Sequence, residues 1–355
     1  MQTLPISIIM PVRNGVPYIT EALASLEAQT AKAAEIIVVD DGSTDATPEI
    51  LAEAAARNPT IRVLRQAPLG IVPARQNGIA TSQQPLVACL DADDIAHPDR
   101  LALQFQRFEA EPDLVLLGSN GMAIDPDGNP IEPMNRPQQH DILVKRLARE
   151  NPFIASAMMF RRSAFYRVGG FRDAFDAAED YDLWLRLAEV GQVANLPQAL
   201  ISYRVWPGSV SHTRALHQNF AADLARRSAA MRRATGLDPA ASLVGRLDWH
   251  QEEAERGPFR AEILRYRALD RLQSGKSVTA SEWPAAFADL AAATRLFTRR
   301  DRAQLQDVLA YHLLHAGLPA SIRATCLWHL LRLGPAKAIK RIYRQRTGPA
   351  VSRGA

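Results

Sequence analysis

The sequence predicts an α/β fold over residues 1–214, a mostly parallel sheet flanked by helices, followed by a mainly helical, basic region over residues 215–355. In the first part, short apolar runs alternate with segments of helical periodicity, which is the order that βαβ units produce. After Thr213 the strand signals vanish, and Ala, Leu and Arg dominate. A chain of 355 residues is also long enough for two domains, since domains commonly hold about 100–200 residues.

The first strands are predicted from apolar runs that are too short for helices and suit strands buried on both faces of a sheet. These runs are Ile6–Pro11, Glu35–Val39, Ile61–Leu64 and Leu86–Leu90. Between the first two, residues 18–29 carry apolar side chains at helical spacing. Thr47 and Pro48 have the character of an N-cap and a first-turn proline, which predicts a helix ending near Arg57.

The later elements are less regular. Strands are predicted at Leu114–Leu117, Ala155–Phe160 and Ala199–Val205, and a helix at Tyr181–Val190, which Gly191 ends. In the second region, segments 259–272 and 302–314 have helical periodicity. No repeat of fixed period occurs, so the sequence does not support a solenoid.

Charge is distributed unevenly along the chain. Residues 1–214 hold 19 basic and 26 acidic side chains, and residues 215–355 hold 23 and 12. The acidic region can supply metal ligands and catalytic carboxylates, whereas the basic region can face phosphates, anionic lipid or nucleic acid. The basic region lacks interleaved aromatic residues, which argues against a nucleic-acid partner.

The two cysteines and the N-terminus bear on the cellular compartment. Two cysteines exclude a disulfide framework and a cysteine-based zinc site. The first residues carry no basic segment of the kind that opens a secretory signal. No run reaches the roughly 18–20 apolar residues that span a bilayer. We therefore expect a cytoplasmic protein, or one docked at the inner face of the membrane.

Acidic residues follow two of the predicted strands. Asp40 and Asp41 end one strand, and Asp91, Asp93 and Asp94 follow another. Open parallel sheets bind ligands beyond the carboxyl ends of their strands. Carboxylates crowded at such an edge suit a divalent cation, Mn²⁺ or Mg²⁺, which would bridge the phosphates of a nucleotide. A solvated acidic turn is the alternative.

Neither a dinucleotide-binding glycine fingerprint nor a P-loop occurs in the chain. The charge of a diphosphate would then be offset by a metal and by basic side chains, for which Arg13 and Arg75 are the candidates. A third acidic group, Glu179 and Asp180, stands at the start of a predicted helix, where the helix dipole favours carboxylates. From a helix start that faces a cleft, a carboxylate could act as a general base.

Together these segments resemble the family 2 glycosyltransferases. The resemblance spans about residues 4–214, and its motifs occur in the family's order and spacing: Ser7–Asn14, Ile36–Asp45, Ala74–Gly78, Leu90–Asp94, Pro98–Leu101 and Glu179–Arg186. It implies a GT-A fold, which is Rossmann-like, a nucleotide-sugar donor and an inverting transfer.

The resemblance also implies roles for individual residues. Nucleotide binding falls to Pro11, Arg13, Asp41, Arg75 and Asp91. The metal ligands it implies are Asp93 and Asp94. Asp180 matches the catalytic base, with Glu179 beside it.

Two departures from the family pattern stand out. Gln76 follows Arg75 where the family often has Asn, which is a small change. Trp206 stands where many members have a histidine that completes the metal site, and a tryptophan cannot ligate a metal. His212 lies six residues further on and is the candidate substitute.

The predicted activity is transfer of a sugar from a nucleoside diphosphate sugar, with UDP favoured, to a hydroxyl of a glycan or lipid-linked acceptor in surface polysaccharide synthesis. The alternatives are a nucleotidyltransferase and a nucleotide-sugar binding protein with impaired catalysis. The basic end of the chain, residues 326–346, either lies on an anionic membrane surface or forms an ordinary helix.

Overall fold

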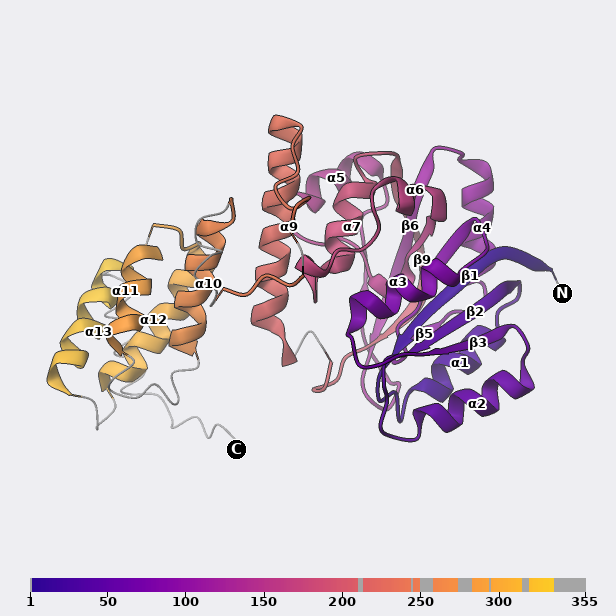
Figure 1. The fold of residues 1–355 in the computed structure, drawn as a ribbon, viewed down its shortest axis with the longest axis horizontal. Coiled ribbons are helices and arrows are strands. Elements are labelled where there is room, and N and C mark those ends of the chain that lie inside the picture. Colours follow the sequence, from indigo (N-terminus) through magenta and orange to yellow (C-terminus); the bar gives the residue numbers. More distant parts are fainter. Residues whose placement is uncertain are drawn as a thin grey trace. The chain divides into compact units, whose positions relative to one another are not determined.

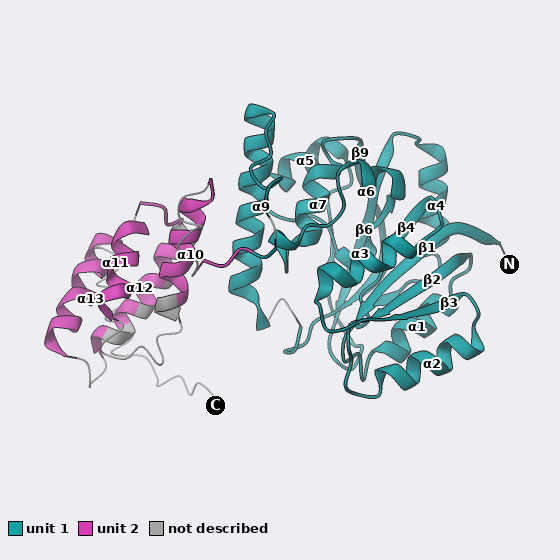
Figure 2. Ribbon diagram, viewed as in Figure 1, with its two compact units in different colours: residues 1–246 teal, residues 247–355 magenta. Residues whose placement is uncertain are grey.

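The computed structural model describes residues 2–209, 213–243, 245–249, 258–273, 283–293, 295–314 and 319–334. The chain forms two compact units, residues 1–246 and residues 247–355 (Figure 2). The first unit extends past residue 214, the predicted end of the catalytic domain, because helix α9 (Ala215–Thr235) packs on α7 (Glu179–Leu187) within that unit.

A β-sheet forms the centre of the first unit (Figure 1). It has nine strands in the order β3-β2-β1-β4-β8-β6-β9-β5, with β7 paired to β6. Its strands are β1 Thr3–Val12, β2 Lys32–Asp40, β3 Ile61–Arg65, β4 Leu86–Cys89, β5 Ile95–Ala96, β6 Leu114–Ile124, β7 Pro130–Met134, β8 Met159–Arg161 and β9 Gln192–Arg204.

Parallel pairing joins β3, β2, β1 and β4, as the sequence predicts, and it also joins β6 to β9. The pairs β4–β8, β6–β8, β6–β7 and β5–β9 are antiparallel. The second half of the sheet is therefore mixed. The predicted strand over residues 155–160 is partly wrong, because residues 155–157 form a 3-10 turn and β8 begins at Met159.

Both faces of the parallel strands are covered, which explains their uninterrupted apolar runs. The even-numbered residues of β1 from Leu4 to Val12 join a core with Leu23 and Phe108, from the helices on one face. On the other face, a Cβ at Gly78 would lie 2.8 Å from Ile9, so α3 approaches the sheet closely there. The helices of this unit are α1 Ile19–Glu27, α2 Thr47–Arg57, α3 Ile71–Thr81, α4 Arg100–Ala110, α5 His140–Leu147, α6 Arg162–Arg167, α7 and α9.

The second unit is helical where it is described, with α10 Arg260–Gln273, α11 Trp283–Ala293, α12 Arg299–Leu314 and α13 Ala320–Arg332. These include the two helices that the sequence predicts there. Buried Trp283, Leu290, Leu305, Leu309 and Leu330 supply its core. The end of the predicted basic segment, from residue 335 onward, lies outside the described residues. Among the helices described in either unit, none combines the length and apolarity needed to cross a membrane.

Candidate functional site

A cleft of about 1020 Å³ opens at the carboxyl ends of β1, β2 and β4. This is the edge where parallel sheets bind ligands. Eight of the residues singled out in the sequence line it, namely Pro11, Arg13, Asp41, Arg75, Asp91, Asp93, Glu179 and Asp180. The folded chain thus brings together segments that lie up to about 170 residues apart in the sequence.

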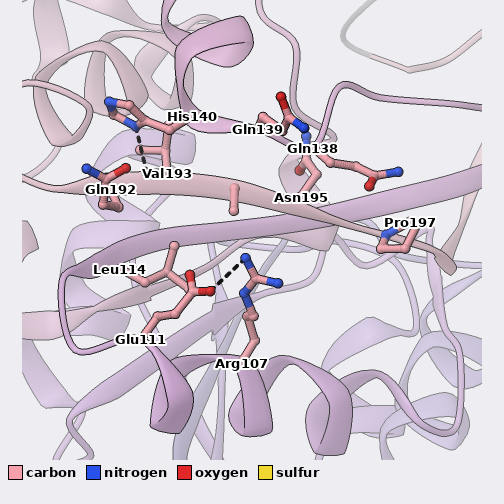
Figure 3. A pocket seen from close by; sticks show the side chains of 11 residues that line it. Arg107, Glu111, Leu114, Gln138, Gln139, His140, Gln192, Val193, Asn195 and Pro197 are labelled. Carbon is pink, nitrogen blue, oxygen red and sulfur yellow. Dashed lines mark hydrogen bonds and ion pairs between the residues drawn. The ribbon is translucent and has the colours of Figure 1, made fainter.

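A second cavity, of about 340 Å³, lies at the opposite edge of the sheet, where Leu114 begins β6 and Gln192 begins β9 (Figure 3). Amide side chains, His140 and an exposed Arg107–Glu111 ion pair surround it. None of the site residues predicted from the sequence lines this cavity. The predicted site residues that line a cavity therefore gather at the larger cleft.

Arg75 on α3 connects two acidic motifs across the large cleft. Its Nη1 donates to Glu179 Oε1 at 2.6 Å, and its Nη2 donates to Asp91 Oδ1 at 2.8 Å. Burial by itself would lower the pKa of Arg75, but the charges of Asp91 and Glu179 raise it further above its ordinary value. A bidentate guanidinium is suited to hold two carboxylates at fixed positions.

Glu179 begins α7, as the helix-start interpretation predicts, and it is 4% exposed. Burial raises the pKa of its carboxyl to about 7, with Arg75 opposing the rise and Asp180 adding to it. Its Oε2 is buried without a hydrogen-bond partner. Glu179 therefore pairs with Arg75 through one oxygen and presents an unsatisfied oxygen beside Asp180.

Asp180 faces the same cleft with a different set of partners. Its Oδ2 accepts from Asn151 Nδ2 at 3.2 Å, and its Oδ1 accepts from the backbone N–H of Tyr181 at 2.6 Å. Burial raises the pKa of Asp180, while Arg75 and these two donors lower it. The two donors fix the orientation of a carboxylate that lines the cleft.

The aspartates that follow β4 lie in different surroundings. Asp93 lines the cleft, and its Oδ2 accepts from Trp206 Nε1 at 2.9 Å. Asp94 does not line the cleft: it is 1% exposed, and its Oδ1 accepts from the backbone N–H of Arg204 at 2.8 Å. Burial, with the charges of Asp93 and Asp91, raises the pKa of Asp94 well above its ordinary value. Asp94 thus ties this loop to β9 through one oxygen, while its Oδ2 is buried without a hydrogen-bond partner.

Trp206 packs into the wall of the cleft beside Asp93. Its ring meets the Tyr18 ring edge-on, with 5.5 Å between the ring centroids. The Arg204 guanidinium lies over the Tyr18 ring, 4.4 Å from its centroid. A Cβ at Gly208 would stand 2.0 Å from the indole, so only glycine fits there. The position at which many family members have a histidine holds instead a hydrogen-bond donor to Asp93. His212, the candidate substitute, lies outside the described residues.

Asp41 holds the loop that precedes α3. Its two oxygens accept from the backbone N–H groups of Leu69 at 2.8 Å and Gly70 at 2.9 Å. Gln66 Nε2 also donates to it, at 2.8 Å. This arrangement shapes the end of the cleft formed by β1 and β2, where Pro11 and Arg13 also lie.

Several lining residues carry no motif that a single sequence reveals. Asn151 orients Asp180, and Arg136 reaches the cleft from the segment after β7. Asp176, which also lines the cleft, pairs with Arg214 at 2.6 Å and with Arg246 at 3.4 Å. These residues reach the cleft only because distant segments of the chain fold against one another. The strong turn at residues 125–130 is the one sequence signal near Arg136.

Comparisons with known proteins agree with this geometry. The model of "Glycosyl transferase family 2" matches residues 7–169. The amylovoran biosynthesis glycosyltransferase AmsE of Erwinia amylovora is 32% identical over 197 residues, which cover 55% of this chain and 73% of that protein. An uncharacterized glycosyltransferase of Haemophilus influenzae is 30% identical over 212 residues, which cover 58% and 78% of the two chains.

Other relatives are much longer. The O-antigen biosynthesis protein RfbC of Myxococcus xanthus is 33% identical over 187 residues, 52% of this chain but 14% of RfbC. The match to an uncharacterized Sinorhizobium fredii protein covers 23% of that relative. The chain therefore spans less than a quarter of the length of these two relatives.

Solved structures share the fold. Residues 1–349 of Staphylococcus aureus TarS, in complex with UDP-GlcNAc, match with a TM-score of 0.55 and 18% identity over 98% of this chain and 92% of that one. The sheet with its flanking helices and the helical C-terminal region thus correspond to a GT-A glycosyltransferase fold. From the similarity to AmsE, together with the family match and the shared fold, we conclude that the chain belongs to glycosyl transferase family 2.

Proposed function

We propose that this protein transfers a sugar from a nucleoside diphosphate sugar to a hydroxyl of a glycan or lipid-linked acceptor, with inversion at the anomeric carbon, in surface polysaccharide synthesis. The observation that carries the proposal is the meeting of Asp91, Asp93 and Asp180 in one cleft. The first two stand where a sugar diphosphate is expected, and the third is suited to take a proton from an acceptor.

UDP is the proposed nucleotide. The TarS structure in complex with UDP-GlcNAc supports a uridine donor through its fold. The names of AmsE and RfbC connect the family's relatives to polysaccharide and O-antigen synthesis, which supports a glycan or lipid-linked acceptor.

A divalent cation, Mn²⁺ or Mg²⁺, fits the residues at the Asp-x-Asp. The described residues contain no group of three or more His, Cys, Asp or Glu side chains able to enclose a metal. Asp91 and Asp93 nevertheless line the cleft, and one oxygen of each is engaged, by Arg75 and by Trp206. Mg²⁺ is commonly held by one or two carboxylates together with substrate phosphates and water. Asp93 would hold the cation, with Asp91 beside it, and the bound cation would neutralise charge on the diphosphate.

In the proposed mechanism, Asp180 accepts the proton of an acceptor hydroxyl. The hydroxyl oxygen supplies the electron pair of the new bond to the anomeric carbon, attacking from the face opposite the diphosphate. The bond between that carbon and the diphosphate oxygen breaks, and its electron pair leaves with the nucleoside diphosphate. Arg75 holds Asp91 and Glu179 in place, and the Asn151 amide orients the Asp180 carboxylate.

The proposal is tested by a calorimetric screen of nucleotides and nucleotide sugars with Mn²⁺, with Mg²⁺ and with a chelator. We expect UDP and a UDP-sugar to bind more tightly with metal than with chelator. In turnover assays with acceptor glycans, the released product should be the nucleoside diphosphate. Release of pyrophosphate would favour a nucleotidyltransferase, and donor binding without turnover on any acceptor would favour a catalytically impaired binding protein.

The Asp93→Asn variant should lose most of the advantage that Mn²⁺ gives to UDP binding. A hydrogen bond or contact to a charged group is worth about 1.5–3 kcal/mol, so the Kd for UDP with Mn²⁺ should rise by about ten- to hundredfold. Calorimetry with Mn²⁺ and with chelator measures this, and Asp127→Asn, at an exposed turn, serves as the matched control. An unchanged Kd with Mn²⁺ would remove Asp93 from the metal site.

The Asn151→Ala variant should shift the acid limb of the kcat/KM profile to higher pH. The Asn151 amide donates to the Asp180 carboxylate and lowers its pKa. Without this donor the pKa of Asp180 rises further, and a base is active only when ionised. The pH profile of turnover measures the shift, with Asn129→Ala as the control at an exposed position. An acid limb that stays in place or moves to lower pH would contradict the role of Asn151.

A further inference from the structure

Arg136 brings a positively charged side chain to the cleft. Its backbone N–H donates to Asn120 Oδ1 at 2.7 Å, which anchors the segment after β7. The side chain lines the cleft and is half-buried. Within the described part of the chain, its guanidinium makes no hydrogen bond or ion pair, and its Nε is buried without a partner.

The other buried or half-buried arginines of the cleft are engaged. Arg75 holds Asp91 and Glu179, and Arg214 pairs with Asp176, as does the exposed Arg246. Burial lowers the pKa of Arg136, whereas Glu150 opposes this effect and nearby Arg146 adds to it. Burying a charged group without a hydrogen-bonded partner is costly. A bound group that accepts hydrogen bonds from Arg136 would offset this cost.

The position of Arg136 separates it from the nucleotide end of the cleft. Asp41 follows β2, whereas Arg136 follows β7, and β1, β4, β8 and β6 lie between these strands in the sheet order. Glu150, whose charge acts on Arg136, immediately precedes Asn151, the lining residue that donates to Asp180. Arg136 therefore lies on the side of the proposed base, where an acceptor has to bind.

We propose that Arg136 binds an anionic group, a carboxylate or a phosphate, on the acceptor saccharide. The planar fork of an arginine side chain matches both groups through paired N–H donors. This binding would position an acidic acceptor so that one of its hydroxyls reaches Asp180. The inference rests on the proposed function and adds the chemical class of the acceptor to it.

The test uses the full chain loaded with UDP and Mn²⁺. Four small probes are titrated in matched pairs: methyl β-glucuronide against methyl β-glucoside, and glycerol 3-phosphate against glycerol. Binding is followed by NMR through the arginine Nε–H signals, with the Arg136 signal assigned by its absence in Arg136→Gln. The glucuronide arm reports a carboxylate-bearing acceptor, and the glycerol phosphate arm a phosphate-bearing one.

We expect one anionic probe to shift the Arg136 signal while its neutral partner does not. In Arg136→Gln the affinity for that probe should fall about tenfold or more, as expected for the loss of a charge-assisted contact. Arg146→Gln, an exposed arginine on α5, is the matched control and should bind the probe like the wild type.

Two results would overturn the inference. One is equal binding of the anionic and neutral probes, or no response of the Arg136 signal to any of them. The other is a tenfold loss of UDP affinity in Arg136→Gln, which would assign the side chain to the donor diphosphate. Failure of the wild type to bind UDP with Mn²⁺ would instead contradict the proposed function, so the two failures are distinguishable.

Discussion

The Asp180→Asn variant is expected to keep its fold and lose about 10²–10⁴-fold in kcat, the usual contribution of general-base catalysis. The amide has nearly the same shape as the carboxylate and still accepts a hydrogen bond from the Tyr181 N–H, but it cannot take a proton from an acceptor hydroxyl. Release of nucleoside diphosphate in the presence of acceptor measures kcat, and calorimetry with UDP shows whether the donor site is intact.

Asp141→Asn, an exposed acidic residue in the first turn of α5, is the matched control for this variant. It should turn over like the wild type. If Asp180→Asn has the wild-type kcat, Asp180 is not the base, and Glu179 is the neighbouring carboxylate to test in its place. A loss of UDP affinity equal to the loss of kcat would make Asp180 a donor-binding residue.

The Arg75→Met variant is expected to lower the free energy of unfolding by about 3–5 kcal/mol, the range found when one partner of a buried ion pair is removed. The side chains of Arg75 and Glu179 are 8% and 5% exposed, so neither charge is replaced by water at low cost. Without Arg75, Glu179 keeps the repulsion of Asp180 and loses the cation that lowers its pKa.

The loss of unfolding free energy in Arg75→Met should depend on pH. In the wild type, the pKa of Glu179 is raised to about 7, above its value in the unfolded chain. A carboxyl of this kind is more easily buried when protonated, so its contribution to stability is present at low pH and falls as pH rises toward 7. Removing Arg75 raises the pKa further. The deficit of Arg75→Met should therefore be small near pH 5 and larger near pH 8.

Urea denaturation at the two pH values measures this effect. Arg57→Met, at the exposed end of α2, is the control and should change the free energy of unfolding by less than about 0.5 kcal/mol. Equal stability of Arg75→Met and wild type at pH 8 would show that the Arg75 bridge is not a structural element of the cleft.

The parallel half of the sheet is predictable from sequence because its strands are buried on both faces. Ile36–Val39 reads as an uninterrupted apolar run since the sheet separates two layers of helices there. The end of such a strand is also where ligands bind, so Asp91 and Asp93 can be assigned to the cleft before folding is known. The position of Glu179 is also predictable, on a different ground, because the dipole at a helix start favours a carboxylate.

The remaining features depend on contacts between distant segments. Asp94 has the same side chain as Asp93 and follows it directly in the sequence. Its carboxylate, however, accepts a hydrogen bond from the backbone N–H of Arg204, 110 residues away. Arg136 and Asn151 lie in loops whose course is set by β7, β8 and the turns between them. The 3-10 turn at residues 155–157 interrupts an apolar run that otherwise predicts a strand. Local patterns do not encode these pairings.

The anomeric configuration of the transferred sugar tests the central proposal most directly. An enzyme in which Asp180 activates the acceptor for a single attack opposite the diphosphate has to invert the anomeric carbon. With an α-linked UDP-sugar as donor, NMR of the H1 signal of the purified product should show a β-linkage, and Asp180→Asn should make far less of it. An α-linked product would contradict single displacement from this cleft and the role of Asp180 as its base.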